Sequence, residues 1–194
     1  MTYTLLALIT LSLAPRQDSL PLRHTPQGNT LTLNVGRLRA LAIDSQFAYI
    51  GGQRFILRSS ADVEQHIFAS TESNGALRSF YWIQIEELLP QREGAYNYAA
   101  DATVVHHGFA LRRNTLSYTA PPEGDSDRAR AFAILRARGY SIPAGAMRVR
   151  LIYIPEDNPR REVMVIYVRL PNANDTAPID MRALAGLALH PVPR

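Results

Sequence analysis

Cysteine is absent from this chain of 194 residues. Its absence excludes disulfide bonds, thiolate zinc sites, iron–sulfur clusters and a cysteine nucleophile. Lysine is absent as well, and all 21 basic residues are arginine. Such a uniform replacement is typical of genome-wide codon bias, so the formal net charge of +4 does not by itself indicate an anionic partner.

The sequence also lacks the short motifs that mark several common enzyme classes. It contains no GxxxxGKS/T, no GxGxxG, no HExxH and no GxSxG. It therefore carries no signature of a phosphate loop, a dinucleotide-binding fold, a zinc protease or a serine hydrolase. No apolar run is long enough to cross a bilayer. We predict no cofactor, no bound metal and no transmembrane segment.

The first 14 residues, MTYTLLALITLSLA, are the candidate targeting segment. No basic residue precedes the apolar run, and Pro15 would follow the cleavage point; both features are atypical of a secretory signal. The alternation of Ile9, Leu11 and Leu13 with polar residues also fits a β-strand. A cytoplasmic protein is therefore favoured, and export through a cleaved signal is the alternative.

Composition favours one folded domain behind an N-terminal arm. Apolar residues make up 46% of the chain and charged residues 20%, as in ordinary soluble proteins. Residues 15–29 contain three prolines and a glycine, which predicts a loop or arm. We assign residues 1–29 to this arm with its strand or signal-like segment, and residues 30–194 to a single α+β domain.

Turn signals along the chain predict a series of β-hairpins. The alternating residues 31–43, interrupted by Gly36, indicate a strand with a bulge. Gly51-Gly52 predicts a two-residue hairpin turn between two β-type segments. Further hairpins are predicted to pair 103–105 with 109–111 and 147–154 with 162–170.

Asn74-Gly75 is the strongest of these turn signals, and it lies between the predicted strands 63–70 and 76–87. A two-residue turn would pair Ser73 with Ala76 and thereby fix every later pair. One face of this hairpin then carries Glu64, His66 and Phe68 opposite Ile85, Ile83 and Tyr81. The other face carries Val63, Gln65, Ile67 and Ala69 opposite Glu86, Gln84, Trp82 and Phe80.

One main helix is predicted over about 127–138. Asp125, Ser126 and Asp127 supply an N-cap and acidic residues for its first turn, and Gly139 follows its end. Its apolar stripe is formed by Ala131, Phe132, Ile134 and Leu135. A short C-terminal helix is predicted after Asp180, carrying Met181, Leu184 and Leu187.

These elements predict an α+β fold: an antiparallel hairpin meander that forms a curved or barrel-like sheet, packed by the 127–138 helix. The segment 162–170 is apolar on both faces through its middle, which is typical of a central strand covered on both sides. Neither face of the 63–87 hairpin has the polar composition of a solvent-exposed surface. The sheet is therefore either covered on both sides or curled around an interior.

The first face of the 63–87 hairpin suggests acid–base chemistry. Glu64 and His66 stand two residues apart among apolar neighbours, an environment that can tune both groups for proton transfer. A histidine at the edge of the sheet, with a solvated glutamate, is the structural alternative. Asp62 shares this face, but three side chains spread along one strand cannot enclose a metal ion without ligands from other strands.

The second face suggests a binding pocket instead. Gln65 and Gln84 lie opposite each other beside Trp82 and Phe80, with Glu86 further along the strand. An aromatic surface with a few polar anchors is typical of small-molecule sites. Simple packing of a cross-strand glutamine pair around a buried tryptophan is the alternative.

Two other groups of residues receive a structural interpretation. His106 and His107 are adjacent, so in a regular strand they point to opposite faces and cannot bind one metal ion together. Arg148 and Arg150 share one strand face near Glu162, and Arg160-Arg161 lies at a hairpin tip. Surface ion pairing accounts for these arginines, and a basic strip for phosphate groups is the alternative.

Three functional hypotheses follow. The first is a non-catalytic small-molecule or lipid-binding domain that holds an apolar or anionic ligand with Gln65, Phe80, Trp82, Gln84 and Glu86. The second is an acid–base enzyme that uses His66 and Glu64. The third is a structural or protein-interaction domain without a pocket. Nucleic acid is disfavoured as a partner, because neither an aromatic stacking motif nor a recognition helix accompanies the arginines.

Overall fold

A seven-stranded antiparallel sheet is the largest element of the computed structural model, which describes residues 19–98, 101–119, 124–171, 173 and 175–193. The predictions for residues 1–14 lie outside this range. The strand order is β3-β4-β5-β9-β8-β7-β6. The strands span Ala48–Leu57 (β3), Ala61–Thr71 (β4), Leu77–Leu88 (β5), Ala102–His106 (β6), Phe109–Ser117 (β7), Met147–Tyr153 (β8) and Arg161–Arg169 (β9).

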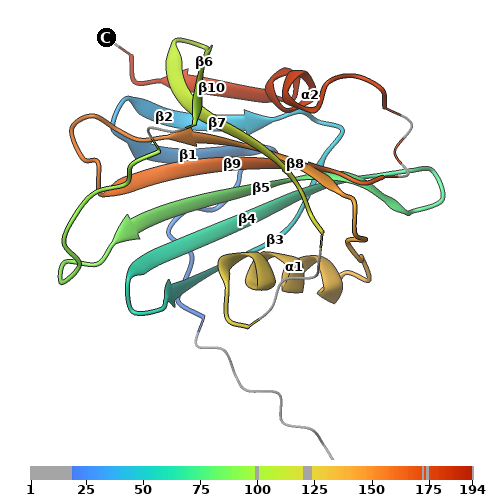
Figure 1. Ribbon diagram of the computed structural model, residues 1–194, viewed down its shortest axis with the longest axis horizontal. Coiled ribbons are helices and arrows are strands. Elements are labelled where there is room, and N and C mark those ends of the chain that lie inside the picture. Colours follow the sequence, from blue (N-terminus) through green and yellow to red (C-terminus); the bar gives the residue numbers. More distant parts are fainter. Residues whose placement is uncertain (1–18, 99–100, 120–123, 172, 174, 194) are drawn as a thin grey trace, which may run out of the picture.

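A second, three-stranded sheet covers one face of the first (Figure 1). It has the order β1-β2-β10, with β1 at Thr30–Val35, β2 at Leu38–Ile43 and β10 at Leu187–Pro191. The helix α2 (Ile179–Ala185) lies on this side, and the helix α1 (Asp127–Ala137) covers part of the opposite face. The α+β prediction is confirmed, but the large sheet is open: within the described chain β3 and β6 form its two edges, and it does not close into a barrel.

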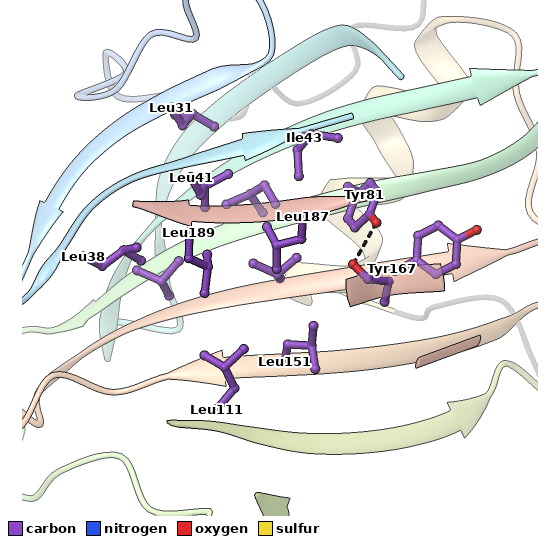
Figure 2. Close-up of a cluster of buried hydrophobic side chains, with 14 of the residues drawn as sticks. Leu31, Leu38, Leu41, Ile43, Tyr81, Leu111, Leu151, Tyr167, Leu187 and Leu189 are labelled. Atoms are coloured by element: carbon purple, nitrogen blue, oxygen red, sulfur yellow. Dashed lines mark hydrogen bonds between the residues drawn. The ribbon is translucent and has the colours of Figure 1, made fainter. Parts of the chain in front are cut away.

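The main core lies between the two sheets (Figure 2). Leucines and isoleucines of the small sheet meet aromatic residues of the large one, among them Tyr81 and Tyr167, whose ring centroids are 5.0 Å apart. The Tyr81 hydroxyl donates to the Ala183 carbonyl of α2 at 2.9 Å, which connects the helix to the centre of the core. Labelled members of this core in Figure 2 include Leu31, Leu41, Leu151 and Leu187.

A second core lies under α1. Ser126 caps the helix, its hydroxyl accepting a hydrogen bond from the Ala129 amide at 3.1 Å, and Ala131, Phe132 and Leu135 are buried. They pack on side chains of the large sheet that include Ile67, Phe80 and Trp82. The predicted helix and its apolar stripe are therefore confirmed.

The strand β9 occupies the position predicted for it. It lies between β5 and β8, and its residues 162–168 are buried. One side of the strand contributes to each core, since Val163 and Val165 belong to the first and Met164 and Ile166 to the second. The hairpins β6–β7 and β8–β9 are also found as predicted.

Two predictions based on glycines were wrong: a predicted bulge is a turn, and a predicted turn lies within a continuous strand. Gly36 forms the turn between β1 and β2 instead of a bulge within one strand. Gly51 and Gly52 continue β3, where the register shifts between Tyr49 and Gly51. The reason is close packing: a Cβ at Gly52 would lie 2.7 Å from the Gln65 carbonyl oxygen, and one at Gly51 would lie 3.1 Å from Ile134 of α1.

The Asn74-Gly75 turn is also longer than predicted. The Gly75 amide donates to the Glu72 carbonyl and the Glu72 amide to the Ala76 carbonyl, so three residues form the loop and Ser73 does not pair with Ala76. A register shift between Ser70 and Thr71 compensates for the extra residue. The predicted pairs from Val63–Glu86 to Ala69–Phe80 are therefore correct.

The C-terminal helix is shorter than predicted. Asp180 lies inside its first turn, and Pro178 is the N-cap residue without a side-chain hydrogen bond. Ile179 and Ala183 are the buried residues of α2, whereas Met181 is 63% exposed. Leu187 lies beyond the helix, at the start of β10, because the chain turns there to pair with β2.

Candidate functional site

An open hollow of about 670 Å³ lies on the face of the large sheet that α1 covers only in part. It is located beside the N-terminal end of α1, above β5, β9 and β8. We call it the Trp82 hollow. Its lining residues are Leu57, Arg58, Trp82, Glu86, Tyr98, Ser126, Asp127, Arg128, Arg148, Arg150, Glu162, Met164 and Ile166.

A row of glutamines borders the hollow and leads to Glu86. Gln53 donates to Gln65 and Gln65 donates to Gln84, each at 2.8 Å, and Gln84 donates to a Glu86 carboxylate oxygen at 2.7 Å. The Gln65 amide also donates to the Asp127 carbonyl at 2.9 Å. Because adjacent strands place these residues directly opposite one another, the chain of amides is continuous across β3, β4 and β5. It holds both Glu86 and the first turn of α1.

Two glutamates and two tyrosines form the acidic end of the hollow. Glu86 and Glu162 are a direct cross-strand pair between β5 and β9. The Tyr96 hydroxyl donates to Glu86 at 2.9 Å, and the Tyr98 hydroxyl donates to Glu162 at 3.2 Å. Burial, together with the charge of the nearby Glu86 carboxylate, raises the pKa of Glu162 to about 8. Burial also raises the pKa of Glu86. At neutral pH the Glu162 carboxyl is therefore mostly protonated.

Four arginines also line the hollow, and we call them the arginine wall. Arg128 and Arg148 lie on the Tyr118 ring, with their guanidinium carbons 5.4 and 5.5 Å from its centroid. Within the described part of the chain, Arg58, Arg128 and Arg148 form no ion pair with a carboxylate. Arg150 differs, because it pairs with Asp101 at 3.3 Å. Three cationic groups of the hollow thus have no acidic partner among the described residues.

Three residues of the hollow also contain buried polar atoms that have no partner among the described residues. Trp82 Nε1, Arg150 Nε and Glu162 Oε2 are buried and make no hydrogen bond to any described residue. All three residues line the hollow. A buried polar group without a partner costs about 1–3 kcal/mol. A ligand that supplied both an acceptor and a donor could remove part of this cost.

The residues predicted for the second face fall into three positions. Trp82 and Glu86 line the hollow. Gln65 and Gln84 lie next to it, in the glutamine row that fixes Glu86. Phe80 is fully buried against Phe132 of α1, with ring centroids 6.3 Å apart, so it belongs to the core. Its assignment as a ligand-binding residue stays a prediction that this geometry does not favour.

Glu64 and His66 lie on the other face, beneath the N-terminal arm. Glu64 Oε1 is 2.9 Å from His66 Nε2 and 3.1 Å from His24 Nδ1, and both side chains of the predicted pair are buried. Burial alone would raise the pKa of Glu64, but the hydrogen bonds from the two histidines and from the Arg23 and His24 amides lower it below its usual value. Neither Glu64 nor His66 lines the Trp82 hollow. The acid–base hypothesis on this pair stays a prediction.

The remaining candidates have structural partners. His106 Nε2 lies 2.8 Å from the Leu187 carbonyl, and His107 Nδ1 accepts from the Leu189 amide at 3.0 Å, so the two histidines join the β6–β7 hairpin to β10. Arg161 lies 3.5 Å from Glu87 as a surface ion pair, and Arg160 donates to carbonyl groups of residues 89–94. Asp62 pairs with Arg54 and Arg23.

Sequence reasoning missed Tyr96, Tyr98 and Arg128. Tyr96 and Tyr98 precede β6 in a segment without regular structure, and Arg128 begins the helix. One signal was available: tyrosines at alternate positions in YNY place both hydroxyls on one side of an extended chain. Without tertiary structure, nothing indicated that this segment lies beside β5 and β9.

Comparison with family models, with curated proteins and with solved structures finds no match for this chain. The candidate site therefore rests on its own geometry. None of the helices in the described ranges is both long and apolar enough to cross a membrane.

Proposed function

We propose that this protein is a non-catalytic binding domain for a small organic anion, which it holds in the Trp82 hollow. The observation that carries the proposal is a set of three arginines, Arg58, Arg128 and Arg148, that line the hollow and form no ion pair with a carboxylate of the described residues. A volume of about 670 Å³ lies within the range of small-molecule sites, about 300–1,000 Å³.

The rest of the lining supports a ligand with an anionic group and an apolar body. Trp82, Met164 and Ile166 offer an apolar floor. Arginine forks onto carboxylate or phosphate oxygens with two parallel hydrogen bonds, so the arginine wall suits either group. Because Glu162 is mostly protonated at neutral pH, it would not repel such an anion and could donate a hydrogen bond to it. A charged wall of this kind fits a lipid tail or a wholly apolar ligand less well.

The chain's single tryptophan gives a direct test, because it lines the hollow. Tryptophan emission would be recorded while the protein is titrated with phenyl phosphate, with inorganic phosphate and with phenol. We expect a saturable change with phenyl phosphate and a much weaker response to phenol, which lacks the anionic group. A response to phenol as strong as that to phenyl phosphate would contradict an anion site.

Arg148→Met removes the charge and keeps most of the side-chain stem, so it should weaken phenyl phosphate binding at least tenfold. Arg39→Met is the matched control: it makes the same change at an exposed position of β2 in the small sheet, away from the hollow. Equal affinities in the two variants, or no saturable binding by the unmodified protein, would overturn the proposal.

A further inference from the structure

The N-terminal arm brings a third metal-binding side chain to the buried Glu64–His66 pair. His24 precedes β1 and lies against β4, far from Glu64 in the sequence. Its Nδ1 is 3.1 Å from Glu64 Oε1, and His66 Nε2 is 2.9 Å from the same oxygen. All three ligand atoms lie within 4.8 Å of one another.

The spacing of these atoms is close to that of a metal centre. Around a tetrahedral zinc ion, nitrogen and oxygen ligands at about 2.0–2.1 Å lie about 3.3 Å from one another. The two nitrogen–oxygen distances found here are only a few tenths of an ångström shorter. A small shift of the two rings would therefore open a position that all three atoms can reach.

The chemical types of the three ligand atoms also fit a zinc site. Two imidazoles and one carboxylate are ligands that zinc and other late first-row divalent ions prefer, whereas calcium and magnesium favour oxygen alone. We propose that His24, Glu64 and His66 form a binding site for a divalent transition-metal ion of the zinc class. This site is independent of the Trp82 hollow, since it lies on the opposite face of the large sheet.

Neighbouring groups hold the ligands as an outer shell would. The Tyr49 hydroxyl lies 3.3 Å from His66 Nδ1, which leaves Nε2 directed at Glu64. The Arg23 amide donates to Glu64 Oε2 at 2.9 Å and the His24 amide to Oε1 at 2.8 Å. These bonds fix the carboxylate and the arm together, so the ligands are positioned by the fold and not by chance contact of mobile side chains.

The three proposed ligands are largely shielded from solvent. His66 and Glu64 are 0% and 3% exposed, and the His24 side chain is 12% exposed. The fourth ligand of the bound ion would be a water molecule. This water would enter from the side of the N-terminal arm, where His24 is the most accessible of the three ligands. A bound ion would join residues 23 and 24 to β4 and stabilise the docking of the arm against the sheet.

Cobalt provides the test, because tetrahedral Co²⁺ has visible absorption bands and substitutes for zinc. The full chain would be stripped of metal with a chelator and titrated with Co²⁺ and, in a separate calorimetric experiment, with Zn²⁺. We expect one equivalent to bind, with visible bands of a four-coordinate ion, and Zn²⁺ to raise the melting temperature. No binding above the level of a nonspecific surface site would overturn the proposal.

His24→Ala should weaken metal binding at least a hundredfold and abolish the zinc-dependent rise in melting temperature. Because His24 lies on the arm outside both sheets, this variant is expected to fold, which circular dichroism would check. His190→Ala is the matched control, since His190 is exposed on β10. If His24→Ala bound Co²⁺ as tightly as His190→Ala, His24 would not be a ligand and the three-residue site would be excluded.

Discussion

Glu86 and Glu162 lie directly opposite each other on β5 and β9, a position in which two like charges repel. The fold accommodates them by giving each a tyrosine donor, Tyr96 for Glu86 and Tyr98 for Glu162. It also buries Glu162 to 1% exposure, which disfavours its ionised form. The pair therefore avoids carrying two full negative charges at neutral pH, and this has consequences for stability and for binding.

The first consequence is that stability should fall as the pH rises from about 5 to about 8. Burial and the Glu86 charge raise the pKa of Glu162 from 4.5 in the unfolded chain to about 8 in the folded protein. Between these values the folded protein holds a proton that the unfolded chain has released, so raising the pH favours unfolding. Glu162→Gln removes this dependence and should be more stable than the original protein at pH 9, by about 2–4 kcal/mol.

Urea unfolding at pH 5, 7 and 9 would measure the effect. Glu156→Gln, at an exposed position of the β8–β9 hairpin, makes the same substitution outside the hollow and should leave the pH dependence unchanged. Glu64 contributes in the opposite sense: its lowered pKa supports the fold above about 4.5, and that support is lost as the pH falls further. Stability that rose between pH 5 and 8 in the original protein would contradict the assignment of a protonated Glu162.

The second consequence concerns the proposed ligand. Ionisation of Glu162 would place a negative charge in the hollow, so phenyl phosphate binding should weaken as the pH rises through about 8. The charge of the phosphate itself changes near pH 6 and is constant above pH 7. Affinities measured by tryptophan emission at pH 7 and pH 9 should therefore differ several-fold in the original protein and stay nearly equal in Glu162→Gln. The same decline in both proteins would show that Glu162 does not control binding.

The glutamine row should be important for stability. Gln65 is fully buried and bonds to Gln53, to Gln84 and to the Asp127 carbonyl. Gln65→Leu keeps the side-chain size but leaves these three groups without their partner, and it should lower the free energy of unfolding by about 2–4 kcal/mol. Gln53→Leu is the control, because Gln53 is half-buried on the edge strand β3 and has one such bond. Both variants would be measured by urea unfolding. A smaller loss of unfolding free energy for Gln65→Leu than for Gln53→Leu would mean that the glutamine row contributes little to stability.

Local sequence signals predicted most of the elements because they act over a few residues. Ser126 and Asp127 at the start of α1 supply their own capping groups, and the alternation around Asn74-Gly75 marks which residues share a face. This was enough to place Gln65, Trp82, Gln84 and Glu86 on one side of the β4–β5 hairpin. It could not show that Phe80 is covered by α1 while Trp82 borders a hollow, because that depends on where the helix ends above the sheet.

The residues that sequence reasoning missed come from distant parts of the chain. Tyr98 reaches Glu162 across 64 residues, and His24 reaches Glu64 across 40. Neither Tyr98 nor His24 belongs to a periodic segment, so no local pattern indicates its partner. The glycines were misread for the same reason. A glycine needed for a turn and a glycine needed for close packing look alike in the sequence, and only the structure distinguishes Gly75 from Gly52.

This distinction gives a final prediction, in which the same substitution has two different costs. Gly75 has a φ of +83° and open space around it, so Gly75→Ala introduces only backbone strain, worth about 1 kcal/mol. A Cβ at Gly52 would lie 2.7 Å from the Gln65 carbonyl and 2.9 Å from His66 Nδ1. Gly52→Ala must therefore push β3 away from β4 or displace the buried His66 ring, and should cost about 2–3 kcal/mol. Urea unfolding would compare the two variants. A cost for Gly52→Ala no greater than that for Gly75→Ala would mean that β3 and β4 separate easily, and that His66 is held less firmly than its contacts with Tyr49 and Glu64 indicate.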